Sequence, residues 1–250
     1  MKPKTARKRL DLLLVERAFA DSGQKALAMI LAGEVQVDGQ RAEKAGMPVA
    51  EDARIEVFSR TQKFVSRGGT KLEGALQDFA IMPAGCVCLD IGASNGGFTD
   101  CLLQQGAARV YAVDVNVKQL DWKLRQDARV IPIERNAREL LADDLPESVD
   151  IIVIDVSFIS VRKVISPAME VAKPSAAFLI LIKPQFELAR EEIGSGGIVK
   201  DQKLHDRAIQ SVREHAVSIG LDCLGVRPSH LLGAEGNQEY FLHACKKTLE

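Results

Sequence analysis

The chain has 250 residues, of which 46% are apolar and 27% are charged, and its formal net charge is −1. This composition is that of a folded globular protein and excludes a largely disordered chain. No apolar stretch approaches the roughly 20 residues that a membrane-spanning helix needs, and no apolar signal-peptide core follows the basic first residues. We therefore expect a cytoplasmic protein with one large domain or two smaller ones.

The small net charge hides an uneven distribution. Residues 1–71 contain 14 Lys and Arg against 9 Asp and Glu, a net charge of +5. The remaining residues contain 19 against 25, a net charge of −6. A basic segment joined to an acidic body is typical of a nucleic-acid-binding domain attached to a catalytic domain.

The first segment is expected to form a small α+β unit. Apolar spacing predicts two helices and two short strands, over Leu10–Phe19, Lys25–Ala32, Val35–Val37 and Ala53–Phe58. Asp21 or Ser22 can cap the second helix, and Gly33 ends it. Asp38 and Gly39 form a strong hairpin turn signal after the first strand.

From residue 63 onward, short apolar strands alternate with helices. After a helix at Lys71–Phe79, strands are expected at Cys86–Ile91, Arg109–Val115, Val130–Ile133, Ile151–Val156, Phe178–Ile182, Asp222–Val226 and Glu239–Ala244. This alternation predicts a Rossmann-like α/β sheet with helices on both faces. The five cysteines have no metal-ligand spacing, so we expect reduced core thiols and no metal site.

A glycine-rich turn follows the first strong strand and opens a helix. Glycines let a ligand approach the backbone closely, and the helix N-terminus offers unpaired N–H groups. The candidate cofactor residues here are Asp90, Gly92, Ser94, Gly96, Gly97 and Phe98. Asp114 ends the next strand and can accept both hydroxyls of a ribose, while Asn136 can reach an adenine or simply cap its own loop.

Charged side chains follow two apolar strands directly. Asp155 comes after Ile151–Ile154, and Lys183 comes after Phe178–Ile182. These two strands are expected to be neighbours, so both side chains should lie at the same edge of the sheet, in the cofactor crevice. A charge at the end of a buried strand is costly unless it is paired or functional. Together with Lys71 and Glu239, these two residues form either a salt-bridge network or a catalytic set. In a catalytic set, a lysine amine that lies near a second cation and away from water can act as a base.

The motifs together resemble those of the TlyA (haemolysin A) family. Residues 8–58 resemble an S4-type RNA-binding module, and residues 63–245, with SRGGTKL, DIGASNGGF, IDVSFIS, LIKPQFE and GNQEYF, resemble an FtsJ-type methyltransferase. The resemblance implies 2′-O-methylation of cytidine ribose in ribosomal RNA, with S-adenosylmethionine as the donor. It assigns the catalytic set to Lys71, Asp155, Lys183 and Glu239, and it implies an S4-like domain at 1–59, a linker at 60–65 and a methyltransferase domain at 66–250.

The S4-like segment departs from the family pattern at one position. Gly23 follows Ser22 where the family often carries an Arg that would contact RNA. The remaining candidate RNA contacts are Arg7, Lys8, Arg9, Lys25, Arg60, Lys63 and Arg67.

Three other functions remain as alternatives. One is a methyltransferase for a base atom or a small molecule, although no N-P-P-Y-like motif is present. Another is an RNA-binding ribosome-assembly factor with an inactive methyltransferase domain, against which the intact catalytic set argues. The third is a membrane-active haemolysin, for which the acidic Asp11 and Glu16 of the first helix are unfavourable.

Overall fold

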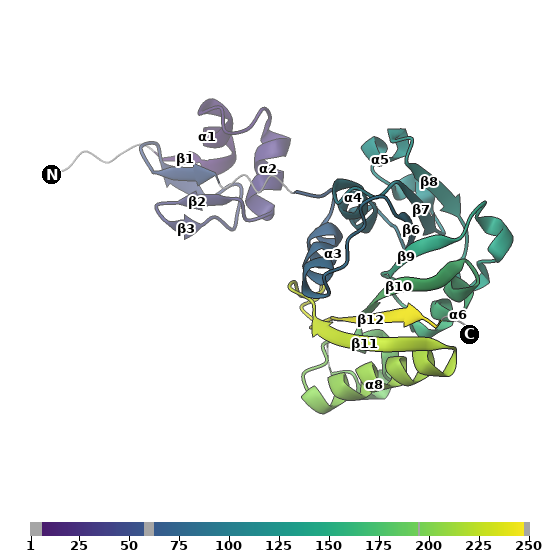
Figure 1. Ribbon diagram of the computed structural model, residues 1–250. Coiled ribbons are helices and arrows are strands. Elements are labelled where there is room, and N and C mark those ends of the chain that lie inside the picture. Colours follow the sequence, from purple (N-terminus) through teal and green to yellow (C-terminus); the bar gives the residue numbers. More distant parts are fainter. Residues whose placement is uncertain (1–6, 58–62, 195, 248–250) are drawn as a thin grey trace. The chain divides into compact units, whose positions relative to one another are not determined.

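The computed structural model describes residues 7–57, 63–194 and 196–247 (Figure 1). The chain divides into two compact units, Met1–Thr61 and Gln62–Glu250. Arg60, one of the expected RNA contacts, lies outside the described residues.

The first unit packs two helices against two small sheets. Its elements are β1 (Arg7–Arg9), α1 (Leu10–Glu16), α2 (Gly23–Leu31), β2 (Val35–Val37), β3 (Gln40–Arg41), β4 (Pro48–Ala50) and β5 (Ile55–Val57). β1 pairs with β4, which the sequence did not predict, and β2 lies between β3 and β5. Ser22 caps α2 by accepting a hydrogen bond from the backbone N–H of Lys25 at 3.2 Å. Asp38 and Gly39 have φ values of 50° and 80°, which confirms the predicted tight turn between β2 and β3.

The second unit is built on a seven-stranded sheet in the order β11-β12-β10-β9-β6-β7-β8. Its strands are β6 (Val87–Ile91), β7 (Arg109–Asp114), β8 (Val130–Glu134), β9 (Val149–Ile154), β10 (Ala172–Ile182), β11 (Leu221–Pro228) and β12 (Tyr240–Lys246). β12 is antiparallel to both of its neighbours, whereas β8, β7, β6, β9 and β10 pair in parallel. The expected α/β sheet is therefore confirmed.

Helices cover both faces of this sheet (Figure 1). The α-helices are α3 (Arg67–Asp78), α4 (Gly97–Gln104), α5 (Trp122–Gln126), α6 (Arg162–Glu170), α7 (Pro184–Glu187) and α8 (Gln202–Ser218), and short 3-10 helices lie at Val117–Gln119, Ala137–Glu139, Ala142–Asp144 and Arg190–Glu192. One core contains apolar residues of α3, α4 and α5, including Leu72, Leu102 and Leu124. The opposite core contains residues of α6 and α8, including Ile165 and Val212.

Helix α3 begins four residues earlier than predicted, and glycines lie within its first turn. Ser66 caps it by accepting a hydrogen bond from the Gly68 N–H at 3.3 Å. A Cβ at Gly97 of α4 would lie 2.1 Å from Ser66 Oγ and 2.9 Å from the Gly69 nitrogen. The start of α3 therefore rests directly on the start of α4, a tertiary contact that outweighs the low helix propensity of glycine.

We expect Gly97→Ala to destabilise the second unit by about 1–3 kcal/mol, because the added methyl group has no space between α3 and α4. Thermal unfolding without any ligand measures this loss. Gly225→Ala is the matched control, since its Cβ would meet Phe79 at an ordinary 3.4 Å. Equal melting temperatures for both variants would contradict the close contact.

Candidate active site

Two of the charged residues singled out in the sequence lie at the carboxyl ends of neighbouring strands. Asp155 follows β9 and Lys183 follows β10, and the two strands pair in parallel. Parallel strands present their carboxyl ends at the same edge of a sheet, where ligands bind in open α/β folds. The pairing thus brings Asp155 and Lys183 together at the expected edge.

The four charged residues form two ion pairs. Lys183 Nζ lies 2.5 Å from Asp155 Oδ1, and it donates a hydrogen bond to Ser157 Oγ at 2.8 Å. Lys71 Nζ donates to Glu239 Oε2 at 2.5 Å. Both lysines and Glu239 are less than a tenth exposed, so each charge is compensated by its partner rather than by water.

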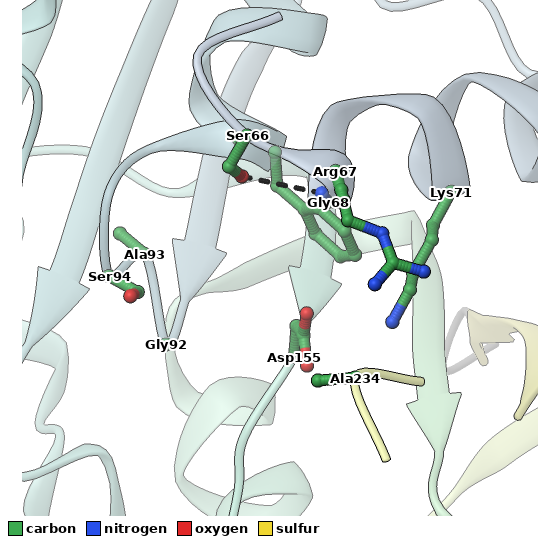
Figure 2. A pocket seen from close by; sticks show the side chains of 11 residues that line it. Ser66, Arg67, Gly68, Lys71, Gly92, Ala93, Ser94, Asp155 and Ala234 are labelled. Carbon is green, nitrogen blue, oxygen red and sulfur yellow. Dashed lines mark hydrogen bonds between the residues drawn. The ribbon is translucent and has the colours of Figure 1, made fainter. Parts of the chain in front are cut away.

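The two pairs are connected by a hollow between α3 and the sheet edge. Figure 2 shows Lys71 and Arg67 of α3 reaching toward Asp155, with Ala234 across from them. The hollow measures about 190 Å³ and is also lined by Gly92, Ser94 and Gly97. One member of each ion pair, Lys71 and Asp155, therefore lines the hollow beside the glycine-rich turn.

The glycine-rich turn is shaped by close backbone contacts. Gly92 has a φ of 84°, and a Cβ there would lie 2.3 Å from the carbonyl oxygen of Asp155. The Ser94 N–H donates to Asp114 Oδ2 at 2.9 Å, and the Asn116 N–H donates to Asp114 Oδ1 at 3.0 Å. These bonds hold the Asp114 carboxylate at the end of β7.

A second hollow of about 400 Å³ adjoins the first and shares Gly92, Ser94 and Asp155 with it. Asp114 and Asn136 line it, together with apolar residues such as Val115 and Ile159. The Asn136 side chain also accepts a hydrogen bond from the Arg138 N–H, so it caps its own turn as well as facing the hollow.

A third hollow lies beyond Phe158, which it shares with the second. Phe158 is 84% exposed, and its ring lies 5.3 Å from that of Phe186, centroid to centroid. Lys183 Nζ lies 5.9 Å from the Phe186 centroid. No sequence motif singled out this aromatic pair or Ser157, although both phenylalanines and Ser157 stand within three residues of Asp155 or Lys183.

Asp90 and Gly96 are not among the residues that line the first two hollows. Asp90 is completely buried, and its Oδ2 accepts a hydrogen bond from the Thr99 hydroxyl of α4 at 2.7 Å. Burial raises the pKa of this carboxyl to about 7, although the Thr99 hydroxyl favours the ionised form. Gly96 packs against Leu124 of α5, since a Cβ there would lie 2.2 Å from that side chain.

The expected RNA contacts lie in both units. Arg7, Arg9 and Lys25 are exposed in the first unit; Lys8 pairs with Glu16, and Arg9 pairs with Asp11. In the second unit, Lys63 pairs with Glu73. Arg67 lines the first hollow and donates to the carbonyl of Leu232 at 2.9 Å.

The described part of the chain offers no cluster of three or more His, Cys, Asp or Glu side chains that could hold a metal ion. Within the same residues, no helix is long and apolar enough to cross a membrane. The five cysteines form no disulfide; Cys88 and Cys101 are buried, and Cys86, Cys223 and Cys245 are only half-buried.

Comparisons with known proteins agree with this architecture. Residues 64–246 match the FtsJ-like methyltransferase family, and residues 8–55 match the S4 domain. The "16S/23S rRNA (cytidine-2'-O)-methyltransferase TlyA" of Mycobacterium tuberculosis is 44% identical over 94% of this chain and 89% of its own. "Hemolysin A" of Brachyspira hyodysenteriae is 40% identical over 94% of this chain and 98% of its own. A solved structure from Streptococcus thermophilus is 35% identical, with a TM-score of 0.76 over 98% of this chain and 90% of that one.

We expect Asp90 to make the stability of the second unit depend on pH. The native carboxyl keeps its proton up to about pH 7, whereas an unfolded one loses it at about pH 4. The native state therefore binds more protons in this window, and wild-type stability falls as pH rises, by at most about 1.4 kcal/mol per pH unit.

The side chain in Asp90→Asn cannot ionise and keeps an oxygen for the Thr99 hydroxyl. The free energy of unfolding of this variant, relative to that of wild type, should therefore increase from pH 4 to 7 and then level off. Denaturant unfolding across this range measures the difference. Asp143→Asn, at an exposed position, should show no such trend. A constant difference between Asp90→Asn and wild type would mean that Asp90 does not titrate in this window.

Proposed function

We propose, because the chain belongs to the FtsJ-like methyltransferase family, that it transfers a methyl group from S-adenosylmethionine to the 2′-hydroxyl of cytidine ribose in ribosomal RNA. The cytidine and the ribosomal RNA are the substrate in the name of the M. tuberculosis relative. The S4 domain and the net charge of +5 on residues 1–71 support an RNA substrate for this chain. A ribosomal substrate also implies a cytoplasmic protein.

The observation that carries the proposal is the gathering of two lysine–carboxylate pairs beside the glycine-rich turn. A ribose hydroxyl is a weak nucleophile and must lose its proton as it attacks a methyl group. Lys183 and Lys71 are the amines at this place, and Asp155 and Glu239 compensate their charges. Such an arrangement suits proton removal from a hydroxyl at the edge of the sheet.

The residues around the first two hollows fit S-adenosylmethionine. Asp114 would hold the ribose hydroxyls of the cofactor, the apolar walls near Asn136 would surround its adenine, and Gly92, Ser94 and Gly97 would leave space for its methionine part. Gly92 admits no side chain, because the Asp155 carbonyl occupies that position. When bound, the cofactor supplies the methyl group as an electrophilic sulfonium.

The protein itself would supply the base and its orientation. In its neutral amine form, Lys183 would accept the 2′-hydroxyl proton on the lone pair of Nζ, and Asp155 would stabilise the ammonium group that results. Ser157 fixes the direction of the amine. The exposed ring of Phe158 beside Phe186 offers a flat surface on which a nucleobase can stack.

We assign RNA binding and methyl transfer to separate domains. Residues 1–59 bind RNA through Arg7, Lys8, Arg9 and Lys25, residues 60–65 are the linker, and residues 66–250 carry out methyl transfer. Lys63 and Arg67 are further candidate RNA contacts near the start of the second domain. The proposed contacts predict RNA binding that weakens steeply with salt, since phosphate neutralisation releases counterions.

We expect Asp114→Ala to weaken S-adenosylmethionine binding roughly ten- to hundredfold. A hydrogen bond to a charged acceptor contributes about 1.5–3 kcal/mol, and the variant also releases the Ser94 and Asn116 amides from the carboxylate. Isothermal titration calorimetry measures the affinity. The control is Asp121→Ala, which removes a helix-capping carboxylate nearby and should bind S-adenosylmethionine almost normally. Unchanged affinity in Asp114→Ala would show that Asp114 is not part of the cofactor site.

We expect Lys183→Ala to lower methyl transfer by a factor of about 10²–10⁴, the usual contribution of a general base, while cofactor affinity stays nearly intact. Lys183→Arg should fail as well, since a guanidinium group does not deprotonate in proteins. Mass spectrometry of rRNA nucleosides after reaction with ribosomal subunits measures the product. Lys163→Arg, on an exposed residue of α6, is the control. Substantial activity in Lys183→Arg would refute the general-base role and favour an electrostatic one.

A further inference from the structure

Asn237 is completely buried in the segment between β11 and β12. This segment reaches the site at three places: Ala234 lines the first hollow, Glu235 lines the third, and Glu239 pairs with Lys71. We propose that Asn237 is a positioning residue that joins this segment to residues 196–200 and thereby holds Glu239 against Lys71. The inference rests on the proposed function for its catalytic consequence.

The Asn237 side chain both accepts a hydrogen bond from the neighbouring segment and donates one to it. Its Oδ1 accepts from the Val199 N–H at 2.9 Å, and its Nδ2 donates to the Gly197 carbonyl at 2.9 Å. Neither Gly197 nor Val199 lies in a helix or strand, and the Asn237 side chain supplies a hydrogen-bond partner to each of these backbone groups. One amide therefore fixes two loops at once.

The backbone of Asn237 closes a turn over the catalytic carboxylate. Its carbonyl accepts from the Gly233 N–H at 2.8 Å, and the Gly236 N–H donates to the Gly233 carbonyl at 3.0 Å. A Cβ at Gly233 would lie 2.6 Å from Glu239 Oε1, the oxygen opposite the one that Lys71 contacts. The turn thus packs against one side of the carboxylate while Lys71 holds the other.

A second buried side chain anchors Val199 from α8. The Val199 carbonyl lies 2.9 Å from Nε2 of His205, which must carry the proton there because a carbonyl only accepts. The His205 ring lies edge-on to Tyr240, the residue after Glu239, at a centroid distance of 5.6 Å. Contacts therefore run from α8 through Val199 and Asn237 to the turn beside Glu239.

Asn237→Asp tests this role with little change in shape. An ionised Asp still accepts from the Val199 N–H but cannot donate to the Gly197 carbonyl, whereas a protonated Asp does both. With ribosomal subunits as substrate, the full-length variant at pH 8 should lose at least tenfold in kcat, with the KM for S-adenosylmethionine within twofold of wild type. The ratio of variant to wild-type kcat should rise as pH falls toward 5.5. Gln210→Glu, which adds the same charge on the exposed side of α8, should keep a ratio near one throughout.

Hydrogen exchange at neutral pH gives a readout that does not depend on activity. Amides in residues 196–200 and 233–239 should exchange at least tenfold faster in Asn237→Asp, with the strands of the sheet unchanged. Unchanged exchange in these two segments, or a kcat ratio that does not vary with pH, would overturn the positioning role. A wild-type protein that transfers no methyl group would overturn the proposed function instead, and exchange would still decide the role of Asn237.

A second pair of variants tests the same contacts from α8 if Asn237→Asp does not fold. His205→Gln places an amide N–H where Nε2 now lies, whereas His205→Ala leaves the Val199 carbonyl without this donor. We expect His205→Ala to lower kcat at unchanged cofactor KM and His205→Gln to restore it. Equal kcat values for the two variants would overturn the inference.

Discussion

The organisation of the second unit depends on the compensation of charges that are largely withdrawn from water. Lys71, Lys183 and Glu239 are each less than a tenth exposed, and an isolated charge in such a place is strongly unfavourable. Removing one partner of a buried pair typically costs about 3–5 kcal/mol, because the other charge is left uncompensated. The pairs therefore couple α3 to the residue that precedes β12, and the residue after β9 to the residue after β10.

Glycines allow these charged residues to meet. At Gly92 the carbonyl of Asp155 occupies the space of a side chain, and at Gly97 the Ser66 hydroxyl does. The first contact joins the glycine-rich turn to the segment after β9, and the second joins α4 to the start of α3. The residues that make both contacts, Ser66, Gly92, Gly97 and Asp155, line the hollow beside Lys71.

The basic residues of the S4 unit are partly engaged within the unit itself. Lys8 contacts Glu16, and Arg9 contacts Asp11, so part of the positive charge on residues 1–71 is compensated locally. These are exposed ion pairs, which contribute little to stability and exchange readily for other partners. An RNA phosphate can therefore compete for Lys8 and Arg9 at modest cost, while Arg7 and Lys25 are already exposed.

The sequence alone determined the alternation of strands and helices, the turn at Asp38 and Gly39, and the meeting of Asp155 with Lys183. These features follow from local periodicity and from the rule that neighbouring parallel strands end at one edge. Only the tertiary structure decided that Lys71 pairs with Glu239, 168 residues away, and that Asn237 joins two loops beside that pair. It also decided that α3 begins at Arg67 and that α4 covers Asp90. Such contacts depend on which surfaces pack together, and spacing along a single chain carries no information about packing between distant segments.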